Sequence, residues 1–134
     1  MHKKFIAIAA LLGAFTVILG AFATHTLKKV ATTEVLQIFE TAVKYQMYHV
    51  FALILVGILY MQYTTKPIIY AGNCFIAGII LFSGSLYILC FVKQYGLTYN
   101  WIGAVTPLGG LCFIMGWLCI AYAVLKSQHL NKIN

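Results

Sequence analysis

Residues 5–23 read FIAIAALLGAFTVILGAFA, a run without a single charged side chain. Because a helix rises about 1.5 Å per residue, a run of this length can cross the ~30 Å hydrocarbon core of a bilayer. Three further apolar runs follow, at about residues 42–63, 68–92 and 101–125. The chain therefore has four predicted transmembrane segments.

The composition agrees with a protein whose solvent is lipid. Its 134 residues are 63% hydrophobic and only 8% charged, with a mean hydropathy of +0.94, which does not describe a soluble domain. Backbone groups in hydrocarbon must hydrogen-bond internally, and the alternation of barrel strands is missing. The sequence predicts an all-α integral membrane protein, a four-transmembrane-helix antiparallel bundle forming one domain over residues 1–134. The predicted helices cover about 5–23, 34–63, 68–92 and 101–125.

The second predicted helix begins before its apolar run. Thr32 or Thr33 can supply the N-cap, and apolar residues recur at helical spacing from Val35 on, so the helix begins near Glu34. About 30 residues make it ~45 Å long, which exceeds the hydrocarbon core. Its first turns are therefore expected in the membrane interface.

The formal charge of +7 comes from lysines scattered between the apolar runs. Scattered lysines do not form the basic patch of a nucleic-acid-binding protein, so no nucleic acid partner is expected. Lysine bias in short loops sets membrane orientation, and here the lysines divide five against four between the two sides. Together with the positive start MHKK, this predicts a multi-pass protein of the cell membrane with cytoplasmic N- and C-termini.

The first apolar run also matches a secretory signal peptide. MHKK would be its positive region and Ala21-Phe22-Ala23 its A-x-A cleavage site. The run is longer than the about 7 to 15 apolar residues of such peptides. We therefore expect a retained first helix with His25 in the membrane interface.

Small residues follow helical spacing in the first and last predicted helices. In lipid, helix association depends on close backbone approach, which small residues allow. We expect the first and last helices to be heavily packed against protein, and the second and third to meet more lipid. Gly13, Gly20, Gly109 and Gly116 are the predicted packing glycines. The stripes are Ala7, Ala10, Ala14, Val17, Ala21 and Thr24; Ala9, Gly13, Thr16, Gly20 and Ala23; and Gly109, Cys112, Gly116, Cys119 and Ala123.

The four cysteines all lie inside the apolar runs, without a C-x-x-C pair or zinc-ligand spacing. This argues against a quinone-linked thiol oxidoreductase, whose chemistry needs adjacent exchangeable thiols. Phosphate-binding glycine loops and the G-x-S-x-G and H-E-x-x-H motifs are absent as well. We expect buried packing cysteines, no metal and no cofactor.

Polar residues gather at one depth of the predicted bundle. Antiparallel threading brings the end of helix 1, the first part of helix 2, the last third of helix 3 and the start of helix 4 into one leaflet. Polar groups at membrane depth point inward and find partners. We predict one polar cluster, bordered by His25 and Glu40 and made of Tyr45, Gln46, His49, Ser83, Ser85, Tyr87 and Thr106.

Spacing within the second helix gives His49 two polar neighbours. Tyr45 precedes it by four residues and Gln46 by three, so the three side chains share a face. Glu40 lies about half a turn round from His49. We expect Glu40 to pair with Lys44 or to cap the preceding loop.

Four ordered blocks cover the chain from end to end. They are GAFATHTL at 20–27, FETAVKYQMYH at 39–49, FSGSLY at 82–87 and TPLGGLCFIMGW at 106–117. With these blocks the chain resembles the small bacterial membrane proteins of domain-of-unknown-function family 423, also called UPF 0382. Ala23 and Thr24 depart from a more usual Gly-Ala before the histidine. The resemblance implies a four-helix integral membrane protein, and no established biochemical activity comes with it.

The expected function is non-enzymatic support of membrane and envelope integrity. The lack of a catalytic set, the few charges and the packing stripes favour it, with membrane lipids, a membrane protein partner or a second copy of the chain as partners. The alternative is a small-molecule transporter. Small four-helix exporters need a membrane-embedded carboxylate for proton coupling, whereas Glu34 and Glu40 lie at or outside the interface.

A third hypothesis is an enzyme acting on lipid head groups. His25 or His49 would be its base, and Ser83 or Ser85 its nucleophile. No third group that would orient the base can be named. Hydrogen bonding between helices explains these residues equally well.

Overall fold

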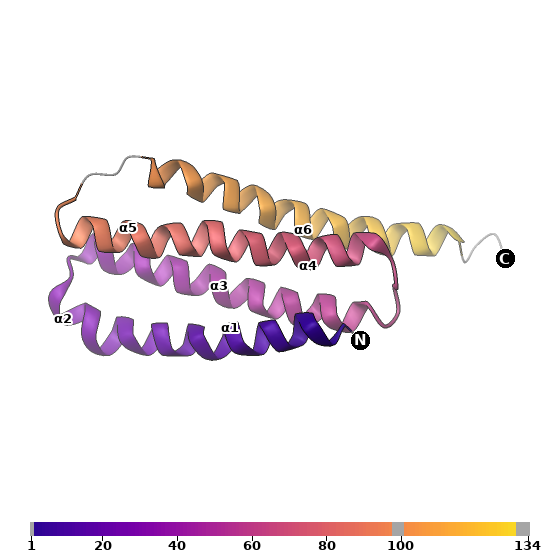
Figure 1. Cartoon of the computed structure of the whole chain (residues 1–134), viewed down its shortest axis with the longest axis horizontal. Coiled ribbons are helices and arrows are strands. Elements are labelled where there is room, and N and C mark those ends of the chain that lie inside the picture. Colours follow the sequence, from indigo (N-terminus) through magenta and orange to yellow (C-terminus); the bar gives the residue numbers. More distant parts are fainter. Residues whose placement is uncertain (1, 98–100, 131–134) are drawn as a thin grey trace.

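The chain folds into four helical spans that lie side by side and alternate in direction (Figure 1). This computed structural model describes residues 2–97 and 101–130, with side chains through residue 126. Each of its four spans is long and apolar enough to cross a membrane, so the predicted all-α, four-helix membrane fold is confirmed. The elements are α1 (Lys3–Phe22), the π-helix η1 (Ala23–Leu27), α2 (Lys28–Val30), α3 (Thr33–Leu59), α4 (Lys66–Gly78), the π-helix η2 (Ile79–Ser83), α5 (Gly84–Gln94) and α6 (Ile102–Leu130).

The first span, α1–η1–α2, continues seven residues past its predicted end at residue 23. The chain stays helical through the polar Thr24–Thr26 stretch because its hydrogen bonds remain internal. Thr24 Oγ1 donates to the carbonyl of Ala21 at 3.0 Å, and Ala31 N–H still bonds to Leu27 O at 2.9 Å. Only at Ala31 does the backbone become extended.

The second span, α3, begins where the sequence predicts. Thr32 Oγ1 accepts a hydrogen bond from Val35 N–H at 3.3 Å, and Glu34 occupies the first turn, where the helix dipole favours an acid. The helix ends at Leu59 and not at residue 63, because the chain turns there and α4 begins just beyond with Pro67 in its first turn. Met61 N–H closes the turn on Ile58 O at 2.9 Å.

The spans pack mainly in the order of the chain. α1 lies on α3, α3 lies on α4 and α5, and α4 and α5 lie on α6. The start of α1 and the end of α6 lie at the same end of the assembly (Figure 1). We call this the terminal end, and the end formed by η1, α2 and the start of α3 the loop end.

Phenylalanine rings fill the spaces beside glycines on neighbouring spans. A Cβ atom on Gly72 would lie 2.5 Å from the Phe5 ring, and one on Gly116 would lie 2.5 Å from the Phe75 ring. At Gly109 the neighbour is backbone, since a Cβ there would lie 2.7 Å from Phe82 Cα. Glycine at these positions lets α1 approach α4 closely, and lets α6 approach both α4 and η2.

Gly13 and Gly20 have more space than Gly109 and Gly116. A Cβ on Gly13 would lie 3.4 Å from Val50, and one on Gly20 would lie 3.8 Å from Val43, both ordinary contacts with α3. All four predicted packing glycines therefore face a neighbouring span. Only those on α6 mark a very close approach.

The expectation that the first and last helices are the most heavily packed is wrong. In the apolar segments of the four spans, 17%, 44%, 39% and 28% of residues are buried, in chain order. The physical reason is the packing order, because an outer span packs mainly on one neighbour and an inner span packs on two. On α1 the stripe with Ala9 and Thr16 faces α3, whereas the stripe with Ala7, Ala10 and Ala14 is exposed.

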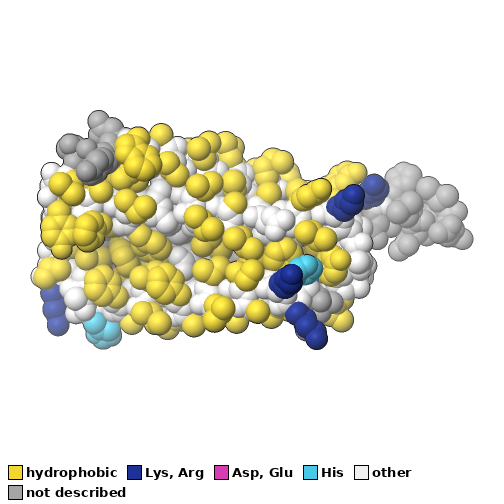
Figure 2. Space-filling model, in the orientation of Figure 1, with side chains coloured by type: hydrophobic (Ala, Val, Ile, Leu, Met, Phe, Trp, Pro, Cys, Tyr) yellow, Lys and Arg dark blue, Asp and Glu magenta, His cyan; other side chains and the backbone are white. Residues whose placement is uncertain are grey.

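The outer surface has the distribution of a membrane protein. Figure 2 shows hydrophobic side chains along the length of the visible face and lysines gathered toward the two ends. Large apolar side chains at mid-span are exposed, among them Leu11 (74%), Ile80 (65%) and Leu118 (57%). Such a surface is compatible with lipid and costly in water.

Candidate functional site

A lateral groove opens at the loop end of the molecule. At the terminal end Phe5 of α1 packs on Gly72 of α4, whereas toward the loop end the first span separates from α5. The groove between them has a volume of about 390 Å³. Its lining consists of Phe22, Leu27 and Val30 from the first span, Val35 and Phe39 from α3, and Tyr87, Cys90, Phe91, Gln94 and Tyr95 from α5 and the residue after it.

The groove is apolar on its floor and open toward the membrane at its rim. Leu27, Val35 and Phe39 are buried on the floor. At the rim, Val30 is 67% exposed and Phe91 is 62% exposed, on opposite sides of the opening. An apolar chain from the surrounding lipid can therefore reach the groove from the side.

A chain of hydrogen bonds closes the deep end of the groove. Tyr87 OH donates to Gln46 Oε1 at 3.0 Å, and Gln46 Nε2 donates to Thr16 Oγ1 at 2.7 Å. Thr16 Oγ1 in turn donates to Leu12 O at 2.6 Å. The chain ties α5, α3 and α1 together and satisfies each polar side chain in its apolar surroundings.

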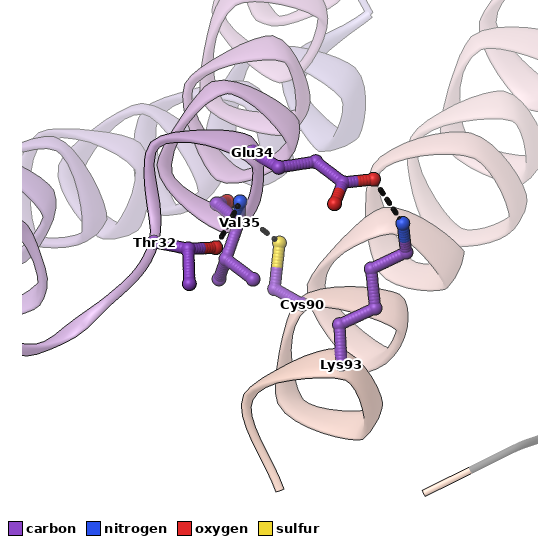
Figure 3. A network of polar contacts seen from close by, with 5 residues as sticks. All are labelled: Thr32, Glu34, Val35, Cys90 and Lys93. Atoms are coloured by element: carbon purple, nitrogen blue, oxygen red, sulfur yellow. Dashed lines mark hydrogen bonds and ion pairs between the residues drawn. The ribbon is translucent and has the colours of Figure 1, made fainter. Parts of the chain in front are cut away.

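Polar contacts also bridge the spans at the outer end of the groove. Gln94 Nε2 donates to Val30 O at 3.2 Å, joining α5 to α2. Cys90 Sγ donates to Val35 O at 3.4 Å, and Lys93 forms an ion pair with Glu34, so that α5 is fixed to the start of α3 (Figure 3). The groove thus has polar closures at both ends and apolar walls between them.

A second polar group lies on the other side of α5. Ser85 Oγ and Thr106 Oγ1 are 2.7 Å apart, and Ser85 Oγ also donates to Phe82 O at 2.9 Å. Beside them lies a hollow of about 340 Å³ between α5 and α6, lined among others by Trp101 and Val105. Among the described side chains, no hydrogen bond links this pair to the Thr16–Gln46–Tyr87 chain.

His49 does not share hydrogen bonds with the predicted polar side chains. Its Nδ1 donates to the backbone carbonyl of Tyr45 at 2.7 Å. Its ring stacks on Phe113, with centroids 3.4 Å apart and planes 7° apart, and Phe75 lies near it at 5.6 Å. The imidazole is buried among aromatic rings, and its stacking on Phe113 joins α3 to α6.

Among the described side chains, the remaining predicted site residues form no hydrogen bond with either group. Ser83 is completely buried, and its hydroxyl has no partner among the described residues. The Tyr45 side chain is 41% exposed, and His25 is exposed on η1. Hydrogen bonds thus connect two separate pairs of the predicted residues, Gln46 with Tyr87 and Ser85 with Thr106, and do not join the whole set.

Glu40 does not form the predicted ion pair with Lys44. Both line a small hollow with Gly20, Ala23 and Thr24 beside η1. The ion pair present among the described side chains joins Glu34 to Lys93. Glu34, in the first turn of α3, can reach Lys93 because the end of α5 lies beside it in the antiparallel arrangement (Figure 3).

The described cysteines are free thiols. Cys90 is buried, and Cys74, Cys112 and Cys119 are half-buried within the spans. Across residues 2–97 and 101–126, no group of three or more histidine, cysteine or acidic side chains has the geometry to hold a metal ion.

The groove was not foreseen from the sequence. The sequence places Thr16 only in a packing stripe and Tyr87 only in the polar cluster, and it gives no sign that the other lining residues face a common groove. The polar residues at one depth are the signal in the sequence that points to this hydrogen-bond chain, because Gln46 and Tyr87 together still need a third hydrogen-bond partner. Identifying Thr16 as that partner requires the lateral order of the spans, which periodicity does not give.

Comparison with known proteins identifies the family. A model for the family described as "Protein of unknown function (DUF423)" matches residues 19–110. The chain belongs to this family. The match includes every residue that lines the groove, so the groove lies within the part of the chain that the family model describes.

Members of the DUF423 family match the chain over nearly its whole length. A UPF0382 membrane protein of Haemophilus influenzae is 37% identical over 97% of this chain and 100% of that protein. The UPF0382 membrane protein YwdK of Bacillus subtilis is 41% identical over 92% of this chain and 98% of that protein. These relatives confirm the resemblance and the membrane assignment. No solved structure matches the chain.

Proposed function

We propose that the protein is a non-enzymatic membrane protein that holds a membrane lipid in the groove between the first span and α5, and thereby supports envelope integrity. The observation that carries the proposal is the groove. Its volume of about 390 Å³ lies within the range of about 300–1,000 Å³ typical of ligand sites. Its apolar walls open toward lipid, and its polar ends are already hydrogen-bonded to protein.

The groove suits an acyl chain better than a polar solute. From Tyr87 to Gln94 the lining extends over two helical turns, about 10 Å along the membrane normal. Its surface is mostly hydrophobic and aromatic, and the Tyr87 hydroxyl is engaged with Gln46. A bound chain would fill space between two spans that otherwise make little contact at this end.

The geometry offers less support for an enzyme or a transporter. Ser85 is bonded to Thr106, and His49 is stacked on Phe113, so no histidine–serine hydrogen bond exists among the described side chains. Glu34 is exposed in an ion pair at the loop end. Among the described side chains, no general base faces a nucleophile, as an enzyme of this kind would need. No carboxylate lies at mid-membrane depth among them, as a proton-coupled transporter would need.

The proposed location is the cell membrane, with both termini in the cytoplasm. The lysines at the start of α1 support this, because positive residues favour the cytoplasmic side. The groove would then lie in the outer leaflet. Reporter fusions at the two ends of the chain test it: two cytoplasmic signals are expected, and two external signals would invert the assignment.

A photoactivatable phospholipid tests lipid binding. In vesicles, cross-links should map to Phe22–Val30 and Tyr87–Tyr95. Val30→Trp should reduce them several-fold, because an indole at this exposed rim position fills the opening. The matched control is Val17→Trp, since Val17 is also an exposed valine on the first span but does not line the groove.

Equal labelling of all outer surfaces, unchanged by Val30→Trp, would contradict lipid binding in the groove. The link to the envelope is tested in the native host. A deletion strain should become more permeable to membrane-active detergents, and the Val17→Trp gene should restore it while the Val30→Trp gene should not. A strain without any envelope change would remove that part of the proposal.

A protein neighbour in the membrane is the second component of the proposal. α1 packs mainly on α3, and its stripe of small residues with Ala7, Ala10 and Ala14 is exposed. Small residues allow close helix contact. Native mass spectrometry from lipid nanodiscs is expected to show a dimer or a complex that Ala14→Leu weakens, whereas a monomer throughout would argue against it.

A further inference from the structure

Two lysines stand at the outer end of the groove. Lys28 and Lys29 form α2 together with Val30, and the residues on either side of them, Leu27 and Val30, line the groove. Both lysine side chains are exposed. The turn that carries these two adjacent cations therefore also forms one edge of the groove's opening.

The depth of these lysines matches the lipid head groups. Lys4 and Lys28 are 24 residues apart, which corresponds to about 36 Å along a helix. The hydrocarbon core is ~30 Å thick, so each end of the first span emerges into a head-group layer. Lys28 and Lys29 therefore lie at the level where a lipid in the groove would place its phosphate.

The charge of these lysines is not neutralised by protein. Lys93, the cation across the groove, is paired with Glu34 (Figure 3). Among the described side chains, neither Lys28 nor Lys29 lies within ion-pair distance of a carboxylate. Two ammonium groups therefore remain available to an anion at the mouth of an apolar groove.

The geometry points to an anionic phospholipid as the occupant of the groove, with its acyl chain against Val35 and Phe39 and its phosphate bonded by Lys28 and Lys29. This inference rests on the proposed lipid-binding function. Ammonium groups form charge-assisted hydrogen bonds with phosphate oxygens. In a zwitterionic lipid the head group's own cation offsets that attraction, whereas a head group of net negative charge retains it.

The size of the preference follows from the number of lysines. Each lysine near a membrane surface contributes a few-fold to the binding of anionic lipid, so two give a preference on the order of 10-fold at low salt. Screening shortens the reach of surface charges, so high salt should reduce this preference. Binding of the acyl chain itself should depend little on salt.

The test compares photoactivatable phosphatidylglycerol and phosphatidylcholine in phosphatidylcholine vesicles containing the full chain. In wild-type protein, phosphatidylglycerol should label the groove peptides on the order of 10-fold more per mole at low salt. The double variant Lys28→Gln/Lys29→Gln should lose this preference and keep its labelling by phosphatidylcholine, which also shows that the fold is intact. The control is Lys3→Gln/Lys4→Gln, the exposed lysine pair at the terminal end, which should keep the preference.

The outcomes separate this inference from the proposed function. Equal labelling of the groove by both lipids in wild type would overturn the head-group assignment and leave acyl-chain binding in place. Loss of preference in Lys3→Gln/Lys4→Gln as well would assign it to overall charge and equally overturn the inference. If neither lipid labels the groove, the proposed function fails, and this inference fails with it.

Discussion

Gly109→Ala should destabilise the protein through a backbone contact. An alanine Cβ at this position would lie 2.7 Å from Phe82 Cα and nearer still to the Phe82 backbone nitrogen. Ordinary carbon contacts begin near 3.5 Å, so α6 must move away from η2 by about 1 Å. Because the neighbour is backbone, no rotamer change can relieve the contact.

The magnitude follows from two opposing terms. Overpacking of this kind costs about 1–3 kcal/mol, and alanine regains about 0.5–1 kcal/mol over glycine within a helix. Taking the middle of each range, we expect Gly109→Ala to lower the free energy of unfolding by about 1 kcal/mol. Circular dichroism during denaturation in mixed micelles measures this difference.

Gly84→Ala is the matched control. Its Cβ would have no neighbour within 4 Å, so only the helix-propensity term acts, and the variant should equal or exceed wild type. If Gly109→Ala proves as stable as Gly84→Ala, α6 does not approach η2 as closely as described, and the close-packing argument fails.

Three further predictions concern single side chains. Thr16→Val and Tyr87→Phe should each cost about 0.6 kcal/mol, and at most ~1.7, and a double-mutant cycle through Gln46 should be non-additive; strictly additive losses would contradict a connected chain. Glu34→Gln should cost less than ~1 kcal/mol and match wild type at high salt, because its ion pair with Lys93 is exposed; a loss that persists in salt would point to another role. His49→Phe should retain more thermal stability than His49→Ala, since stacking on Phe113 dominates its contacts; the reverse order would make its hydrogen bond the larger contribution.

The fold could be predicted because its determinants are local. Run length and hydropathy identify four spans, and the cap at Thr32 fixes where α3 begins. The end of the first span was missed because polar residues at a membrane surface do not stop a helix whose hydrogen bonds stay internal. The π-helix η1 carries the chain through His25 for that reason.

The site could be predicted in depth but not in its contacts. Antiparallel threading correctly brings Gln46 near Tyr87, and Ser85 near Thr106, because depth depends only on position along each span. Which side chains then meet depends on the lateral order and rotation of the spans. That information lies in non-local packing, such as the close approach at Gly109. The sequence therefore shows neither that His49 stacks on Phe113 nor that Glu34, and not Glu40, forms the ion pair.

The packing order of the spans bears on how the protein is made. Each span after the first packs against the span synthesised just before it, starting with α3 on α1. A nascent chain can therefore bury each new helix as it leaves the translocon, without holding the first helix open for the last. Because contacts close in sequence separation form fastest, assembly should follow translation, and truncation after α3 should leave a helical hairpin that still pairs in the membrane.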